Sequence, residues 1–207
     1  MSTSVSGRRH ADAVVFDIGG VLLDWNPRFL YRRLIPDRAE LEWFLTDVCS
    51  MEWNLQLDAG RSFDEACDEL VARYPAHADL VHAWKRQDEM VAGEVPGMVA
   101  VVEDLKANGV PLFLLSNMPA HVYRDRRARY PLLQLFDGAV VSGEEGVLKP
   151  SAEIFARLRA RFGLDPVRTL FVDDVEKNVS GARAAGFQAH WFRDASTLQL
   201  ALKECGL

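Results

Sequence analysis

Residues 13–21 have the sequence AVVFDIGGV, in which four apolar residues lead directly to an acid and two glycines. An apolar run of this length that ends near glycines is typical of a buried strand in a parallel sheet. The predicted strand covers residues 13–16, and Asp17 stands at its carboxyl end. Open α/β sheets bind ligands at the carboxyl ends of their strands, so Asp17 is expected at a ligand site.

A second apolar run, TLFV at residues 169–172, ends in the same way, at Asp173 and Asp174. Two parallel strands would bring these acids to one edge of the sheet. Carboxylates about 4 Å apart repel by about 4 kcal/mol at an effective dielectric near 20. A bound cation would remove this repulsion, and ligands that are all oxygen atoms favour Mg²⁺.

Beyond residue 96, strand and helix patterns alternate along the chain. Predicted strands cover residues 110–115, 138–141, 169–172 and 188–192, and predicted helices cover residues 98–107, 120–130, 152–162, 178–185 and 196–205. This alternation predicts an α/β fold with a doubly wound parallel sheet.

The stretch from residue 26 to residue 92 has apolar residues at helical spacing and no convincing strand. Residues 58–62 are expected as a loop between two of its helices, with Ser62 capping the second. A helical insert after the first strand would lie above Asp17. We therefore predict a core domain of residues 11–25 and 94–207, and a helical cap domain of residues 26–93.

Composition excludes several classes of function. The chain has 207 residues, 49% of them hydrophobic and 26% charged, as expected of a globular protein. A net charge of −6 argues against nucleic-acid binding, and no apolar run is long enough to span a membrane. Residues 1–10 are polar and do not resemble a secretory signal. Three cysteines without metal-binding spacing suggest reduced thiols, so a cytoplasmic location is expected.

Four short motifs follow four predicted strands in order. They are DIGG at residues 17–20, Ser116-Asn117, Lys149-Pro150, and Asp173-Asp174 with Asn178. In these motifs the sequence resembles the haloacid dehalogenase superfamily of hydrolases, in its capped phosphatase branch, and the resemblance extends over residues 12–192. It implies a Rossmann-like core, an α-helical cap and a site that uses Mg²⁺.

Covalent hydrolysis of a phosphate ester requires an ionised nucleophile, and Asp17 is the candidate. Lys149 would supply fixed positive charge to the nucleophile and the phosphate, whose oxygens need a cation and aimed donors. The Ser116 hydroxyl and the Asn117 backbone N–H would bind phosphate oxygens. Asp17 and Asp174 would bind Mg²⁺ directly, with Asp173 as a second or outer ligand.

The remaining site residues are expected to act around this centre. Asn178 would orient Asp174, Lys149 or a metal-bound water. The resemblance implies that the Gly19 carbonyl also binds the metal. In the cap, Trp53 and Arg61 either contact the substrate or belong to the cap's own core and surface. The cluster of arginines between residues 124 and 129 is expected to be a solvated helix face.

The first motif departs from the commonest phosphatase pattern, Asp-x-Asp, because Gly19 replaces the acid that protonates the leaving group. General acid–base help is worth roughly 10²- to 10⁴-fold in rate. Either the substrate has a good leaving group, or another group from the cap or the substrate delivers the proton. Asp24 is a conceivable substitute, although a turn role suits it better. Some sugar-phosphatase members of the family share Asp-x-Gly.

We therefore expect a Mg²⁺-dependent phosphatase acting on a small phosphorylated metabolite such as a sugar phosphate. One alternative is a 2-haloacid dehalogenase, in which Asp17 would attack carbon without a metal. The other is a phosphate-binding or partner-binding module that has lost turnover.

Overall fold

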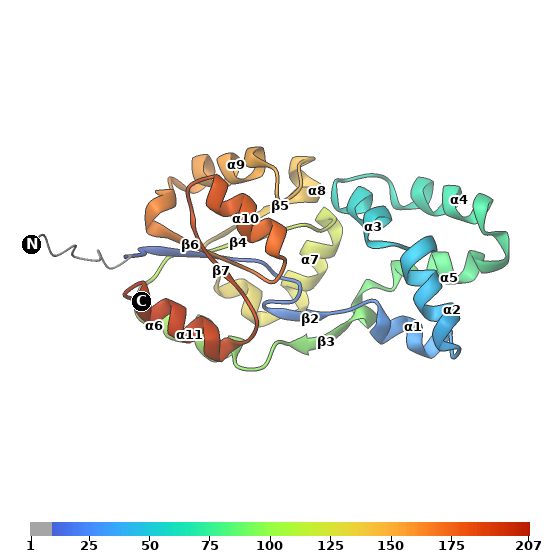
Figure 1. The fold of residues 1–207 in the computed structure, drawn as a ribbon, viewed down its shortest axis with the longest axis horizontal. Helices are drawn as coiled ribbons and strands as arrows, with labels where there is room; N and C mark the ends of the chain where they lie inside the picture. The colour runs from blue at the N-terminus through green and yellow to red at the C-terminus, as the bar shows by residue number, and fades with distance from the viewer. Residues whose placement is uncertain (1–9) are drawn as a thin grey trace, which may run out of the picture.

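A computed structural model describes residues 10–207 and shows a strand-and-helix core joined to a helical cap (Figure 1). Five parallel strands form the core sheet, in the order β5-β4-β1-β6-β7. The strands are β1 (Ala13–Phe16), β4 (Leu112–Ser116), β5 (Gly138–Val141), β6 (Thr169–Asp173) and β7 (Gln188–Trp191). Because β1 lies between β4 and β6, their carboxyl ends bring Asp17, Ser116 and Asp173 to the same edge of the sheet.

Helices cover both faces of this sheet, which confirms the predicted doubly wound α/β fold. The core helices are α6 (Met98–Ala107), α7 (Ala120–Arg129), α8 (Ser142–Glu145), α9 (Ala152–Phe162), α10 (Glu176–Ala184) and α11 (Ala195–Glu204). Alternate residues of β1 point to opposite faces, as the pleat of a strand requires. Val14 packs in the cluster formed with α6 and α11, whereas Val15 packs in the cluster formed with α9 and α10.

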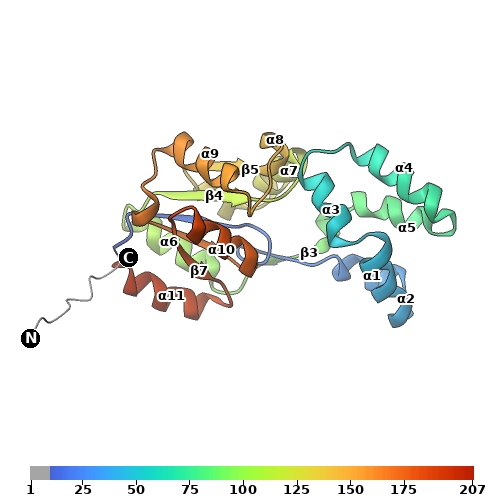
Figure 2. The same cartoon turned by 45° about the horizontal axis from the view of Figure 1, so that its top comes forward.

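The cap is a helical insertion between two short strands. Its helices are α1 (Arg28–Leu34), α2 (Arg38–Trp43), α3 (Met51–Asp58), α4 (Phe63–Arg73) and α5 (Ala78–His82), with shorter turns at residues 44–48, 75–77, 83–85 and 87–90. The strands β2 (Leu23–Trp25) and β3 (Val91–Glu94) pair antiparallel and connect the cap to the core. Both views place α3 beside α8 of the core (Figures 1 and 2).

Two sequence expectations about the cap need correction. The stretch before residue 92 contains the first residues of β3, which sequence patterns missed because three to four residues carry too little periodicity. Asp58, expected in a loop, is the last residue of α3, since helical hydrogen bonds continue through Ala59 N–H to Leu55. Ser62 does cap α4, as predicted, by accepting from the Glu65 N–H.

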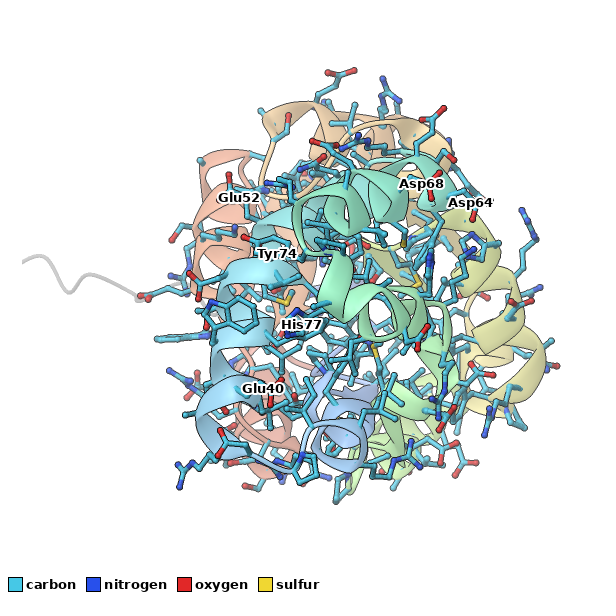
Figure 3. The ribbon with its side chains drawn as sticks, turned by 90° about the vertical axis from the view of Figure 1, so that its right-hand side faces the viewer. Glu40, Glu52, Asp64, Asp68, Tyr74 and His77 are labelled. Carbon is cyan, nitrogen blue, oxygen red and sulfur yellow. The ribbon has the colours of Figure 1, made fainter. Side chains whose placement is uncertain are left out.

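Aromatic side chains hold the cap together. The rings of Trp53 and Trp84 meet edge to face with their centroids 5.4 Å apart, and both are buried in the cap cluster. On the face turned away from the core, His77 lies against Trp43 and beside Glu40, far from the sheet (Figure 3). The cap therefore has a core of its own.

Three further expectations concern features outside the core sheet. All three cysteines are buried, and Cys49 and Cys67 form no disulfide. In the part of the chain that the structure describes, no helix combines the length and apolar character needed to cross a bilayer. The N-terminal segment that the sequence distinguishes from a secretory signal lies, up to residue 9, outside the described residues.

Candidate active site

Asp17 is held at the end of β1 by donors from two neighbouring segments. Its Oδ1 accepts hydrogen bonds from the Ile18 N–H at 2.7 Å and from the Ser116 hydroxyl at 2.8 Å. Its Oδ2 lies 2.9 Å from Nζ of Lys149. The side chain is nearly inaccessible, and burial raises the pKa of Asp17 to about 7, opposed by the charge of Lys149. The neighbouring Asp173 and Asp174 contribute to this raised pKa, so a bound cation would favour the ionised form of Asp17.

Lys149 places its ammonium among three acceptors. Nζ donates to Asp173 Oδ2 at 2.7 Å and to the Leu115 carbonyl at 2.9 Å, in addition to its contact with Asp17. Burial alone would lower the pKa of Lys149, but the charges of Asp17 and Asp173 outweigh it and the pKa is raised. Lys149 is therefore a fixed cation between two carboxylates from different strands.

Asp173 is fully buried and uses both oxygens within the protein. Oδ1 accepts from the Val175 N–H at 2.8 Å, and Asn178 Nδ2 lies 3.1 and 3.2 Å from the two oxygens. Asn178 thus orients Asp173, rather than the Asp174 or Lys149 side chains considered from the sequence. Its own Oδ1 is buried without a hydrogen-bond partner.

The three acids fit a divalent cation. Asp17, Asp173 and Asp174 each offer an oxygen, and these atoms lie within 4.8 Å of one another. Carboxylate oxygens are the ligands that Mg²⁺ prefers. Asp17 and Asp174 line a cavity above the sheet edge, whereas Asp173 is fully buried and outside the lining, so the first two are the better placed pair for direct ligation.

The two glycines after Asp17 differ in what surrounds them. Gly20 has a φ of +73°, and a Cβ there would lie 2.2 Å from Asp174 Oδ2, so a side chain would displace that acid. At Gly19 an added Cβ would meet only the Trp25 Cβ, at 3.9 Å. Residue 19 therefore has room for the Cβ of an acidic side chain, although a glycine stands there.

Asn117 uses its side chain to fix the neighbouring loop. Its Nδ2 donates to the Lys149 carbonyl at 3.1 Å, and its Oδ1 accepts from the Lys149 N–H at 2.8 Å. The Ser116-Asn117 motif and the Lys149-Pro150 motif are therefore hydrogen-bonded to each other directly. The sequence does not predict this contact.

A cavity of about 510 Å³ opens above these residues, between core and cap. Of the predicted site residues, those that line it are Asp17, Gly19, Ser116, Asn117, Lys149, Asp174 and Asn178. Asp173 lies behind Lys149 and outside the lining.

The two cap residues considered for substrate contact do not line the cavity. Trp53 is 5% exposed and donates to the Ala66 carbonyl inside the cap. Arg61 pairs with Glu69 and Gln56 on the cap surface. The structure thus supports the alternative in which both residues serve the cap itself.

Three buried polar residues in the lining were not predicted from the sequence. Asn54 and Asp58 come from α3, and Arg126 comes from α7. Arg126 was expected on a solvated face, yet it is 3% exposed, because it lies one turn after the buried Val122 on the same side of α7. The four-residue spacing between Val122 and Arg126 is the sequence signal that could have predicted this burial. The Nε atom of Arg126 is buried without a hydrogen-bond partner, and the acid that most favours its charge is Asp58.

Comparison with known proteins agrees with this geometry. Residues 11–186 match the family model of haloacid dehalogenase-like hydrolases. A sesquiterpene phosphatase, astK of Aspergillus oryzae, is 27% identical over 93% of this chain and 95% of its own length. A phosphorylated carbohydrates phosphatase of Thermotoga maritima is 25% identical over 86% of this chain and 82% of its own.

Solved structures share the fold. A haloacid dehalogenase family enzyme from Bacteroides thetaiotaomicron, solved with magnesium and inorganic phosphate, superposes with a TM-score of 0.68 at 21% identity. The match covers 91% of this chain and 98% of that one. The chain belongs to the haloacid dehalogenase-like hydrolases, which confirms the superfamily and the hydrolase class expected from the four motifs.

Proposed function

We propose that this protein is a Mg²⁺-dependent phosphatase that hydrolyses a small phosphorylated metabolite through an aspartyl-phosphate formed on Asp17. The observation that carries the proposal is the setting of Asp17, whose carboxylate is bonded to Ser116 and Lys149 beneath the cavity between core and cap. Relatives that cover most of the chain are named as phosphatases, which supports the same reaction.

Each site residue has a role in this scheme. Asp17 attacks phosphorus, and Lys149 holds it in place and balances charge as the phosphoryl group approaches. The Ser116 hydroxyl and the Asn117 backbone N–H bind phosphate oxygens. Asn178 keeps Asp173 oriented toward Lys149.

Mg²⁺ would be held by the Asp17 and Asp174 carboxylates and the Gly19 carbonyl, with Asp173 behind them. When bound, it would neutralise charge on the transferring phosphoryl group. The cap would exclude bulk water from this site.

The cavity lining bears on the substrate class. Polar side chains, Asn54, Asp58 and Arg126, face the same space as apolar ones such as Leu45, Met51 and Val122. A buried guanidinium whose Nε has no hydrogen-bond partner suits an oxygen-rich leaving group, so a sugar phosphate remains the proposed substrate. The apolar side chains favour a second candidate, an organic phosphate with a hydrocarbon body.

The test is turnover of a panel of sugar phosphates, terpenyl phosphates and p-nitrophenyl phosphate with Mg²⁺, with and without EDTA. Asp17→Asn should abolish turnover, whereas Asp24→Asn, the same change at an exposed acid outside the cavity, should not. Release of halide from a 2-haloacid in the presence of EDTA, without turnover of the phosphates, would favour the dehalogenase alternative. Absence of turnover in the wild type on every substrate would favour the binding module.

A further inference from the structure

Gly19 leaves the alcohol oxygen of the substrate without the usual proton donor, and the cavity contains one acid that the proposed scheme does not use. Asp58, the last residue of α3, lines the cavity that also holds Asp17. Asp58 is 6% exposed. The conceivable substitute Asp24 is exposed on β2 and is absent from the lining.

A chain of hydrogen bonds fixes which oxygen of Asp58 can carry a proton. Trp84 Nε1 donates to Asn54 Oδ1 at 3.0 Å, and an indole N–H can only donate. The amide of Asn54 is thereby oriented so that Nδ2 donates to Asp58 Oδ2 at 2.9 Å. Oδ2 is therefore an acceptor. Within the described residues, no group donates to Oδ1, which is left to hold a proton and donate it.

The backbone of Asp58 is tied to the loop that is proposed to bind phosphate. The Asp58 carbonyl accepts a hydrogen bond from the Ser142 hydroxyl, at the start of α8. The same hydroxyl oxygen accepts from the Met118 N–H at 3.0 Å, one residue after Asn117. Two hydrogen bonds thus connect the acid of the cap to the core loop, at the place where α3 meets α8 (Figure 2).

Burial favours the acid form of Asp58 and outweighs the nearby positive charges. Burial raises the pKa of Asp58 to about 8. Arg126 on α7 and Lys149 in the core lower this pKa, and Asp17 raises it, whereas Asn54 on its own helix is neutral. Burial thus favours the protonated form of Asp58 at neutral pH.

We propose that Asp58 is the general acid that protonates the leaving group, in place of the acid that Gly19 lacks. The inference rests on the proposed phosphatase function. As Asp17 forms its bond to phosphorus, the bond from phosphorus to the alcohol oxygen breaks, and the Asp58 proton passes to that oxygen. The resulting Asp58 carboxylate then takes a proton from the water that attacks the aspartyl-phosphate. Inorganic phosphate leaves, and both acids return to their starting states.

The experiment compares wild type and Asp58→Asn on a series of aryl and alkyl phosphates whose leaving groups range from p-nitrophenol to simple alcohols. In wild type, kcat/KM should depend weakly on the leaving-group pKa. In Asp58→Asn the dependence should become steep. The loss should reach roughly 10²- to 10⁴-fold for the poorest leaving group and stay small for p-nitrophenyl phosphate. Asp24→Asn is the matched control.

A rescue variant separates catalysis from structure. Gly19 has room for a Cβ, so Gly19→Asp in the Asp58→Asn background should restore turnover of the poor leaving groups. If Asp58→Asn does not fold, the pH profiles of the wild type test whether Asp58 is the general acid. Turnover of alkyl phosphates should fall above the pKa of Asp58, while p-nitrophenyl phosphate turnover should not.

Equal losses on all substrates, no rescue, or coincident pH profiles would overturn the role of Asp58 and leave the phosphatase proposal intact. A wild type that hydrolyses none of the esters would overturn both.

Discussion

The ammonium of Lys149 lies 2.9 Å from Oδ2 of Asp17, and both side chains are almost completely withdrawn from solvent. The same ammonium lies 2.7 Å from Oδ2 of Asp173. One cation thus links the ends of β1 and β6 to the loop before α9. Removing one partner of a buried ion pair leaves an uncompensated buried charge, which strongly lowers the free energy of unfolding.

Lys149→Met is therefore expected to lower the free energy of unfolding by about 3–5 kcal/mol and to abolish activity, because two buried carboxylates lose their counter-ion. Urea unfolding measures the loss. The control is Lys85→Met, which removes an exposed ion pair with Asp64 and should leave stability unchanged. Similar stabilities for the two variants would show that the Lys149 contacts contribute little to the free energy of unfolding.

Gly20→Ala should weaken Mg²⁺ binding, because the new Cβ would occupy the position of Asp174 Oδ2. Gly109→Ala is the matched control, since Gly109 has nearly the same φ, +74°, and no atom within 4 Å of an added Cβ. Both variants should lose about 1–2 kcal/mol from left-handed backbone strain. Only Gly20→Ala should need more Mg²⁺ for half-maximal activity. An equal Mg²⁺ requirement in both variants would contradict the proposed Mg²⁺ site at Asp174.

Arg126→Met tests whether the buried guanidinium binds the leaving group. We expect a higher KM for sugar phosphates with little loss of stability, because burial disfavours the Arg126 charge and its Nε has no hydrogen-bond partner. Arg127→Met changes an exposed arginine on the same helix and should alter neither quantity. An unchanged KM in Arg126→Met would assign the residue a structural role.

The buried acid of Asp58 should make stability depend on pH. Burial raises its pKa to about 8 in the folded state, from 3.8 for an ordinary aspartate, so between these limits the folded protein holds a proton that the unfolded chain has lost. Stability therefore falls as pH rises through this window.

Asp58→Asn cannot ionise and should become more stable than wild type by about 1.4 kcal/mol for each pH unit across that range. Urea unfolding of both proteins from pH 4 to pH 8 gives the difference. A difference that stays constant with pH would show that Asp58 is ionised in the fold.

The sequence was most informative where chemistry and periodicity coincide. Strands β1 and β5 have the predicted bounds, as do helices α6 and α9, because each is an apolar pattern followed by a polar residue or a glycine. The carboxyl-end rule for parallel strands is enough to predict that Asp17 and Asp174 lie together.

The cap was less predictable for a physical reason. Trp53 is a bulky side chain that either a small core or a substrate pocket would use, and only tertiary packing distinguishes the two. Asp58 and Arg126 look like surface charges in the sequence, since burial of a lone charged residue depends on which helix packs against it. The join between Asn117 and Lys149 depends on side-chain geometry that no local pattern encodes.

The most direct test of the central claim is acid quench of the enzyme during turnover with p-nitrophenyl phosphate and Mg²⁺, followed by mass mapping of the phosphoryl group. The account predicts a phosphoryl group on the peptide that contains Asp17 in wild type, and none in Asp17→Asn. A phosphoryl group on any other residue, or undiminished turnover in Asp17→Asn, would contradict it.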